Sequence, residues 1–136
     1  MGTPELAAPS LQAVLDSGTE ISAVLTQPDR RVGRKQQLQP SPLKQYAQGK
    51  KLTVHTPEKA GSAETIELVS SLAPELVLVC AYGQILPQSF LDIPKIGCFN
   101  LHFSFLPQLR GASPVQAAIA SGFGRTGVSL QKMVLR

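Results

Sequence analysis

Apolar residues in this chain follow two spacings that alternate along the sequence. Leu11, Val14 and Leu15 are spaced as on one face of a helix, whereas residues 76–81 form a continuous apolar run. Such a run is typical of a strand covered on both faces. Helical spacing predicts helices at residues 8–17 and 62–72, Ser41 and Pro42 mark the start of another at residues 41–48, and we expect further helices at residues 87–91 and 114–121. The apolar runs predict strands at residues 21–25, 52–55, 76–81, 98–101 and 127–134.

Helices that alternate with buried strands favour an α/β fold. We expect a doubly wound, mostly parallel, Rossmann-like sheet with helices on both faces. Residues 27–40 are polar and interrupted by Pro28 and Gly33, so we expect a loop there. The pattern opens in a helix, whereas a doubly wound domain normally opens in a strand. We therefore expect the first strand to be missing from this sequence.

Composition adds limits on size and class. The 136 residues suffice for one domain, and 43% hydrophobic residues are typical of a globular protein. No apolar run approaches the roughly 20 residues that span a bilayer, and no signal peptide is evident. We expect a cytoplasmic protein without a membrane or an obligate protein partner. Cys80 and Cys98 lie in apolar runs and are predicted to be reduced core residues, although a nucleophilic cysteine acting with His102 is a sharper alternative.

The chain has a net charge of +4, and its charged residues are distributed unevenly along the sequence. Residues 30–51 contain seven basic and no acidic side chains, while the rest of the chain has six basic and nine acidic ones. A local basic patch indicates a partner that carries phosphate, although a solvated flexible face is the alternative. No acidic residue follows Asp92. We find no cluster of metal ligands in the sequence and expect no metal.

Asn100 and His102 carry the strongest candidate chemistry. They flank Leu101 in a predicted strand, so alternation places both side chains on one face at the strand's end. An amide can donate a hydrogen bond to a developing oxyanion, and an imidazole can donate or transfer a proton. Taken alone, an Asn-x-His pair is more often a polar pair at the edge of a loop. Pro107, Gly111 and Pro114 would stiffen the connection that follows.

The stretch from this pair onward resembles the active-site signature of 10-formyltetrahydrofolate-dependent formyltransferases. The residues that carry the resemblance are Asn100, Leu101, His102, Phe103, Ser104, Phe105, Leu106, Pro107, Arg110, Gly111, Pro114, Ala118 and Ile119. Other segments resemble the branch of this superfamily whose acceptor is methionyl-tRNA. These segments are residues 2–7, 27–30, 33–35, 41–44, 81–87 and 126–128.

The resemblance implies an activity and a set of site residues. A formyl group would pass from 10-formyltetrahydrofolate, the donor substrate, to the α-amine of methionyl-initiator tRNA in translation initiation. Asn100 and His102 would be catalytic, and Arg34 and Lys35 would contact the tRNA. The folate would be held by Ile85, Leu86, Ser104, Phe105, Leu106 and Pro107.

The sequence departs from the family pattern in three respects. The family's catalytic aspartate would fall just past Arg136, its first strand would precede Met1, and its C-terminal β-barrel domain is not seen. We therefore expect residues 1–136 to form a partial catalytic-core domain with impaired formyl transfer. The resemblance leaves open an acceptor that is a sugar nucleotide or a purine nucleotide, a hydrolase of the donor, or a catalytically dead fragment that binds folate or RNA.

Overall fold

The computed structural model describes residues 1–34 and 36–135. Helices and strands alternate along most of the chain, as the apolar pattern predicts. The helices are the 3-10 helix η1 (Glu5–Ala7), α1 (Ala8–Asp16), α2 (Pro42–Gly49), α3 (Ala63–Ser71), α4 (Gln88–Leu91) and α5 (Pro114–Ala120). The strands are β1 (Val24–Leu25), β2 (Arg30–Val32), β3 (Gln37–Gln39), β4 (Val54–His55), β5 (Leu76–Val79), β6 (Gly97–His102) and β7 (Ser129–Lys132).

Two serines fix where helices begin. The side chain of Ser41 accepts a hydrogen bond from the Lys44 backbone N–H at 3.0 Å and caps α2. Ser62 accepts the Thr65 N–H at 3.3 Å and caps α3 in the same way. Each cap satisfies a backbone donor that the first helical turn leaves unpaired. The predicted starts of both helices are therefore confirmed to within a residue or two.

The strands form three small sheets, whereas one doubly wound sheet was expected. β1 pairs with β4 in parallel, β2 pairs with β3 antiparallel, and β5–β6–β7 form the third sheet. Within the third sheet β5 and β6 are parallel, whereas β7 is antiparallel to β6. The mixed α/β class is confirmed. β1 and β5 do not pair with each other. Each contacts the same short segment of the chain, and only at one end.

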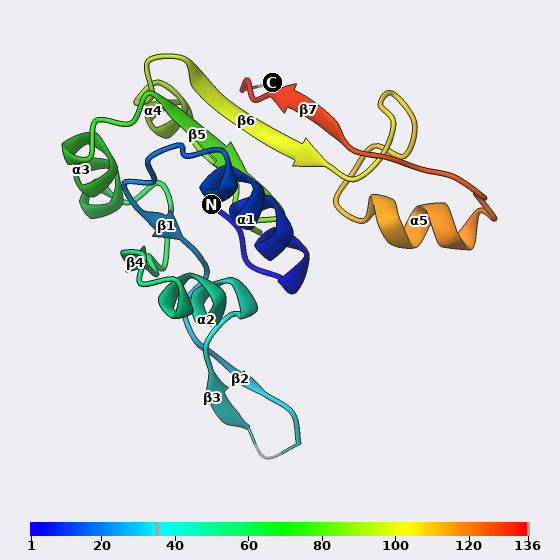
Figure 1. Ribbon diagram of the computed structural model, residues 1–136, viewed down its shortest axis with the longest axis horizontal. Helices are drawn as coiled ribbons and strands as arrows, with labels where there is room; N and C mark the ends of the chain where they lie inside the picture. Colours follow the sequence, from blue (N-terminus) through cyan, green and yellow to red (C-terminus); the bar gives the residue numbers. More distant parts are fainter. Residues whose placement is uncertain (35, 136) are drawn as a thin grey trace.

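That common segment is Met1–Gly2, which lies between β1 and β5 (Figure 1). The Gly2 N–H donates to the Leu25 carbonyl at 3.1 Å, and the Cys80 N–H donates to the Met1 carbonyl at 2.8 Å. Gly2 and Cys80 form a parallel bridge. An added Cβ on Gly2 would lie 2.7 Å from the Cys80 carbonyl oxygen, so this close approach requires glycine.

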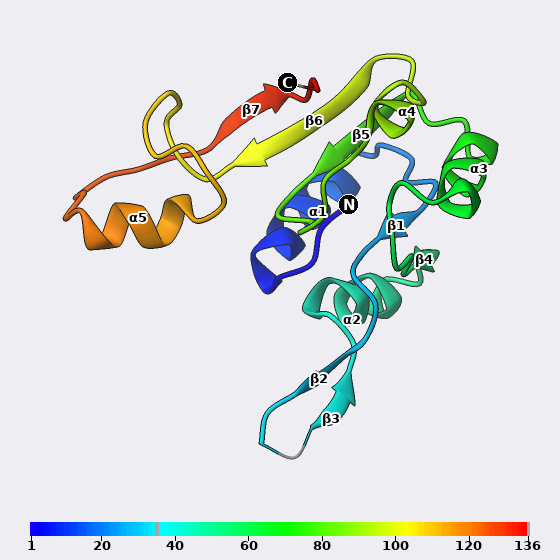
Figure 2. The same ribbon diagram turned by 180° about the vertical axis from the view of Figure 1, so that it is seen from behind.

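The basic segment that was expected to be a loop contains a β-hairpin. β2 and β3 pair over three residues each, all of them exposed, with Gly33 in the turn at φ +73°. The hairpin projects from the body beyond α2 (Figures 1 and 2). Thr26 and Ser41 flank it and are joined by a buried hydrogen bond of 2.6 Å between their hydroxyl groups. The pattern failed to predict these strands because an exposed hairpin needs no apolar face.

The core consists of two clusters of buried side chains. One contains Leu25, Val77 and Phe90, and the other contains Val24, Leu43 and Cys80. Cys80 and Cys98 are both buried and free, which confirms the predicted core cysteines. Burial raises the pKa of the Cys98 thiol to about 11 and also raises that of Cys80. Neither thiol is therefore activated as a nucleophile.

A long connection leaves the carboxyl end of β6 and returns at β7. It contains α5 and extends away from the rest of the molecule (Figure 2). Gly97, where β6 begins, has φ +128°, a conformation that favours glycine. Among the residues that the structure describes, no helix is long and apolar enough to cross a membrane.

Candidate active site

Asn100 and His102 lie in the last three residues of β6, at its carboxyl end. Parallel pairing places Asn100 beside Val79, the last residue of β5. Both side chains line one cavity of about 360 Å³. The other residues around this cavity are Leu106, Pro107, Arg110, Gly111 and Gln131. The two predicted catalytic side chains therefore share a cavity beyond the end of a parallel strand, where open α/β sheets commonly bind ligands.

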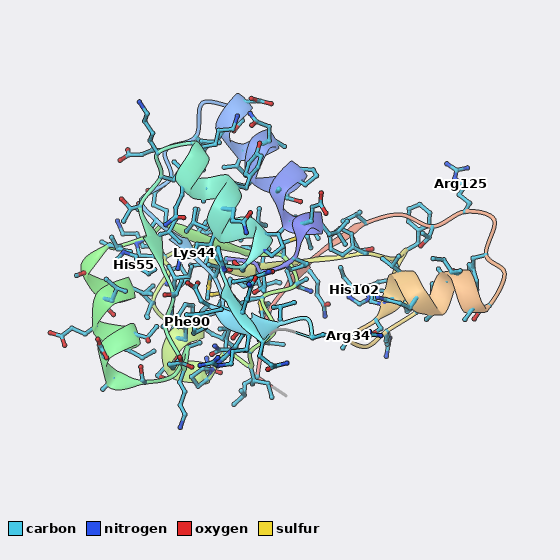
Figure 3. The ribbon with its side chains drawn as sticks, turned by 90° about the horizontal axis from the view of Figure 1, so that it is seen from below. Arg34, Lys44, His55, Phe90, His102 and Arg125 are labelled. Atoms are coloured by element: carbon cyan, nitrogen blue, oxygen red, sulfur yellow. The ribbon has the colours of Figure 1, made fainter. Side chains whose placement is uncertain are left out.

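The imidazole of His102 is oriented by the backbone. Its Nε2 atom lies 2.9 Å from the carbonyl oxygen of Leu109. A carbonyl can only accept a hydrogen bond, so Nε2 carries a proton. In the neutral ring this tautomer leaves Nδ1 without a proton and able to accept one. His102 is labelled in Figure 3, where it lies at the base of the connection that contains α5.

The turn after β6 is held by two serines. Ser104 is completely buried, and its hydroxyl donates to the Gln108 carbonyl at 2.7 Å. The Ser129 hydroxyl of β7 donates to the Ser104 carbonyl at 2.7 Å and accepts from the Leu106 N–H at 3.1 Å. The turn is therefore fastened to the returning strand. This fastening fixes Leu106 and Pro107 at the edge of the cavity.

In the segment from Ala81 to Pro87, neither Ile85 nor Leu86 lines that cavity. The side chain of Ile85 is 90% exposed, whereas Leu86 is buried in the core. The segment is fixed by the Thr3 hydroxyl, which donates to the Tyr82 carbonyl at 2.8 Å. Its backbone is therefore ordered and exposes an apolar side chain to solvent.

Gln84 also fixes this segment. Its amide oxygen accepts the Ala60 N–H at 2.6 Å, and its amide nitrogen donates to the Glu58 carbonyl at 3.1 Å. Of the six residues predicted to hold folate, the structure gathers Leu106 and Pro107 at the cavity. Ser104, Phe105, Ile85 and Leu86 do not line it.

The predicted tRNA contacts lie on the hairpin. Arg34 is exposed at the turn between β2 and β3, and Lys35 lies outside the described residues. Figure 3 labels Arg34 and Lys44. Lys44 donates to the Asp29 carboxylate at 2.6 Å, so its charge is partly neutralised. Arg30 faces Glu58 at 3.4 Å with both side chains mostly exposed, a geometry that contributes little to stability.

Gln131 and Ser129 were missed as site residues in the sequence, and Arg110 and Gly111 entered only as motif positions. Gln131 lies opposite Asn100, and Ser129 lies opposite His102, in the antiparallel pairing of β6 with β7. Alternation along β7 places the side chains of Ser129 and Gln131 on one face. That face can be assigned to the site only when the pairing of β7 with β6 is known. Among residues 1–34 and 36–135, no three potential metal ligands cluster.

Sequence comparison relates the chain to known proteins. The profile of the formyl transferase family matches residues 1–134. The chain is 50% identical over 133 residues to the methionyl-tRNA formyltransferase of Geotalea uraniireducens, covering 98% of this chain and 42% of that protein. It is 48% identical to the protein of the same name from Halorhodospira halophila, covering 97% and 42%. The chain thus spans less than half the length of the curated relatives it matches.

Solved structures show the same fold at low sequence identity. Phosphoribosylglycinamide formyltransferase from Bacillus halodurans matches with a TM-score of 0.75 at 14% identity, covering 99% of this chain and 70% of that one. The enzyme of that name from Streptococcus pneumoniae matches with a TM-score of 0.74 at 17% identity, covering 98% and 71%. With a family profile that spans nearly every residue, the chain belongs to the formyl transferase family.

Proposed function

We propose that this chain carries the catalytic pair of a formyltransferase that acts on methionyl-tRNA, with 10-formyltetrahydrofolate as the formyl donor. The observation that carries the proposal is the shared cavity of Asn100 and His102 at the end of β6. The acceptor is inferred from the relatives, which are about half identical over nearly the whole chain and are named for methionyl-tRNA.

The transfer balances with these two side chains. The α-amine of the methionyl ester attacks the formyl carbon, so a C–N bond forms and the carbonyl electrons move to oxygen. The Asn100 amide donates a hydrogen bond to this oxyanion. The intermediate then collapses, the bond from the formyl carbon to the donor nitrogen breaks, and the proton lost by the amine ends on that nitrogen. Nδ1 of His102 is free to accept the proton and return it, because Nε2 is committed to Leu109.

The donor fits this arrangement in two parts. A cavity of about 360 Å³ is at the small end for ligand pockets, so it suits the formyl group and its immediate surroundings. Leu106 and Pro107 supply an apolar edge to it. We assign the ring system of the donor to the backbone around Ile85 and Leu86, together with the turn of residues 104–107. Exposed Ile85 would then be covered by the donor.

The RNA contact is assigned to the hairpin. Arg34 lies in the turn between β2 and β3, and both Arg34 and Lys35 belong to the stretch of sequence with seven basic residues and no acid. Phosphate contacts of this kind are favoured by the release of counterions and weaken as salt rises. A cytoplasmic location belongs to the same proposal.

We also infer a doubly wound sheet from the separate sheets. A backbone hydrogen bond joins β1 to Gly2, Gly2 forms a parallel bridge with Cys80 directly after β5, and β5 pairs with β6 in parallel. The likeness to solved formyltransferase structures supports this reading, since those chains match 98–99% of this one.

Formyl transfer with the protein in excess over substrate tests the proposal, because slow single turnovers are then measurable. Methionyl-tRNA should be formylated in the presence of 10-formyltetrahydrofolate, and phosphoribosylglycinamide should not. Donor binding, measured separately by calorimetry, should survive the Asn100→Ala substitution while transfer is lost. Faster transfer to phosphoribosylglycinamide would show that methionyl-tRNA is not the acceptor. Absence of donor binding would contradict the proposal as a whole.

A further inference from the structure

Arg110 lines the same cavity as Asn100 and His102. Of the described residues around that cavity, it alone carries a permanent charge, because a guanidinium does not lose its proton in proteins. The proposed transfer gives this charge no task, since the amide and the imidazole serve the oxyanion and the proton. The presence of a cation beside the reacting groups therefore calls for an explanation of its own.

The backbone holds Arg110 next to the imidazole. The carbonyl oxygen of Leu109 lies 2.9 Å from Nε2 of His102, and Arg110 follows that carbonyl directly. The residues on both sides of Arg110 have positive φ angles, +53° at Leu109 and +105° at Gly111. Leucine rarely adopts this conformation, because its Cβ crowds the backbone. Strain of this kind is typical of functional sites, and here it lies in the turn that carries Arg110 to the cavity.

The charge of Arg110 is available to a ligand. Neither of the two ion pairs within the described residues involves Arg110. The residue is exposed at the cavity rather than buried behind it. Residues 93–132 contribute four basic side chains and no acidic one. This part of the chain therefore favours an anion beside Arg110.

The proposed acceptor carries such an anion close to its reacting amine. In methionyl-tRNA the amine belongs to a methionyl group that is esterified to the terminal ribose. The phosphate of the same nucleotide lies on the other side of that ribose and is the anion nearest to the amine. With the amine beside Asn100 and His102, the phosphate would lie toward the exposed rim of the cavity. A guanidinium binds phosphate by charge and by two parallel hydrogen bonds.

We propose that Arg110 is a specificity-determining residue, which binds the phosphate of the acceptor's terminal nucleotide. The inference rests on the proposed transfer to methionyl-tRNA and adds a contact inside the site to the one assigned to the hairpin. Exposed charges on the hairpin attract RNA of any sequence. A contact at Arg110 instead holds the aminoacylated end in register with Asn100.

Two small acceptors test this contact without the rest of the tRNA. In the first, methionine is joined through an amide bond to the 3′-amino group of 3′-amino-3′-deoxyadenosine, so the α-amine is free and the linkage resists hydrolysis. The second also carries a 5′-phosphate. Calorimetry should show that the unaltered chain binds the phosphorylated acceptor roughly ten to a hundred times more tightly. Single-turnover transfer at limiting acceptor should show the same preference.

Three variants assign the preference to one side chain. Arg110→Gln should bring the ratio of the two affinities close to one, by weakening the binding of the phosphorylated acceptor. Arg110→Lys keeps a point charge without the parallel hydrogen bonds, so it should retain part of the preference. Arg125→Gln is the matched control and should keep the full ratio. Arg125 is exposed on the same connection but outside the cavity, and Figure 3 shows it away from His102.

The outcomes separate this inference from the proposed transfer. An unchanged ratio in Arg110→Gln would overturn the phosphate contact, as would equal affinities of the unaltered chain for the two acceptors. Equal losses with both acceptors would assign Arg110 to the formyl group or the donor, and would overturn it too. A preference that Arg110→Gln removes, in a chain that fails to bind the donor, would support the phosphate contact and contradict only the proposed transfer.

Discussion

The two edges of β5 differ in how fully they are paired. Toward β6, all four residues of β5 have parallel partners, and β6 in turn pairs with four residues of β7. Toward β1, the Met1–Gly2 segment makes two hydrogen bonds, to the Leu78 carbonyl and from the Cys80 N–H, and a third joins Gly2 to Leu25 of β1. Figure 1 shows the continuous three-stranded sheet on one side and the short β1 on the other.

The two edges of β5 therefore differ in what they contribute. The paired edge holds Asn100 and His102 in a fixed register, which catalysis by oriented groups requires. The unpaired edge leaves backbone donors and acceptors next to an apolar cavity, which is costly unless a strand or water satisfies them. The candidate site should therefore respond to changes in β6 and β7 and be less sensitive to changes around β1.

The largest expected effect is at the paired edge. Asn100→Ala removes the proposed oxyanion donor and should slow single-turnover formyl transfer about 10²–10³-fold. The melting temperature should stay nearly constant, because the side chain is only half-buried. Quenched time courses with labelled methionyl-tRNA measure the rate.

Gln48→Ala is the matched control for that change. Gln48 is an exposed amide in α2, remote in sequence from the cavity, and helices tolerate alanine well. The control should transfer formyl groups at the unchanged rate. Equal rates for Asn100→Ala and Gln48→Ala would remove Asn100 from the chemistry.

Ser129→Ala should have the next largest effect. It removes the partner of the Leu106 N–H and of the Ser104 carbonyl, and leaving such groups unpaired costs about 1–3 kcal/mol. Urea unfolding measures this loss. Ser129→Thr keeps a hydroxyl and should retain most of the stability, whereas equal losses in both variants would point to strand packing instead.

At the unpaired edge, stability should depend on the ionisation of Met1. Burial lowers the pKa of its α-amine from 8.0 to about 6. Between pH 8 and pH 6 the unfolded chain therefore binds more protons than the folded chain, so stability falls as pH drops through this window. We expect a loss of about 1–2 kcal/mol, allowing for partial exposure of Met1.

Urea midpoints at pH 6 and pH 8 check this dependence. Acetylating Met1 removes the titrating amine, so the acetylated chain should lose less stability over the same interval. The same slope in both forms would show that the Met1 amine is not the source of the pH dependence.

The smallest effect is expected outside both edges, on the hairpin. Arg34→Ala removes one exposed charge and should weaken tRNA binding only a few-fold. The slope of log affinity against log salt should fall in magnitude by about one. Filter binding over a range of salt concentrations measures both quantities. Gln39→Ala on β3 is the neutral control, and an unchanged slope in Arg34→Ala would exclude a phosphate contact there.

Local signals in the sequence predicted the elements well. Ser41 and Ser62 mark helix starts because their hydroxyls satisfy backbone groups within three residues. The apolar run that includes Val77 and Val79 predicted a buried strand because burial on both faces requires such a run. The placement of the Asn100 and His102 side chains on one face of the strand followed from strand alternation alone.

Long-range pairing escaped prediction. Nothing near Gln131 indicates that it faces Asn100, because their relation depends on how β7 returns to β6 after α5. The β2–β3 hairpin escaped because its residues are all exposed and therefore leave no apolar pattern. The link between β1 and β5 through Met1–Gly2 likewise depends on contacts between residues far apart in sequence, such as Gly2 and Cys80.

The hydroxyl-to-hydroxyl bond between Thr26 and Ser41 bears on how this protein can be engineered. This bond joins the two ends of the segment formed by residues 27–40. A change within that segment should therefore have little effect on the packing of the core. The turn at Gly33 is therefore a permissive place to insert a foreign domain, because exposed loop tips tolerate insertions best. A fluorescent protein inserted there would report the binding of a partner to the hairpin. The folding of β5, β6 and β7 should not change.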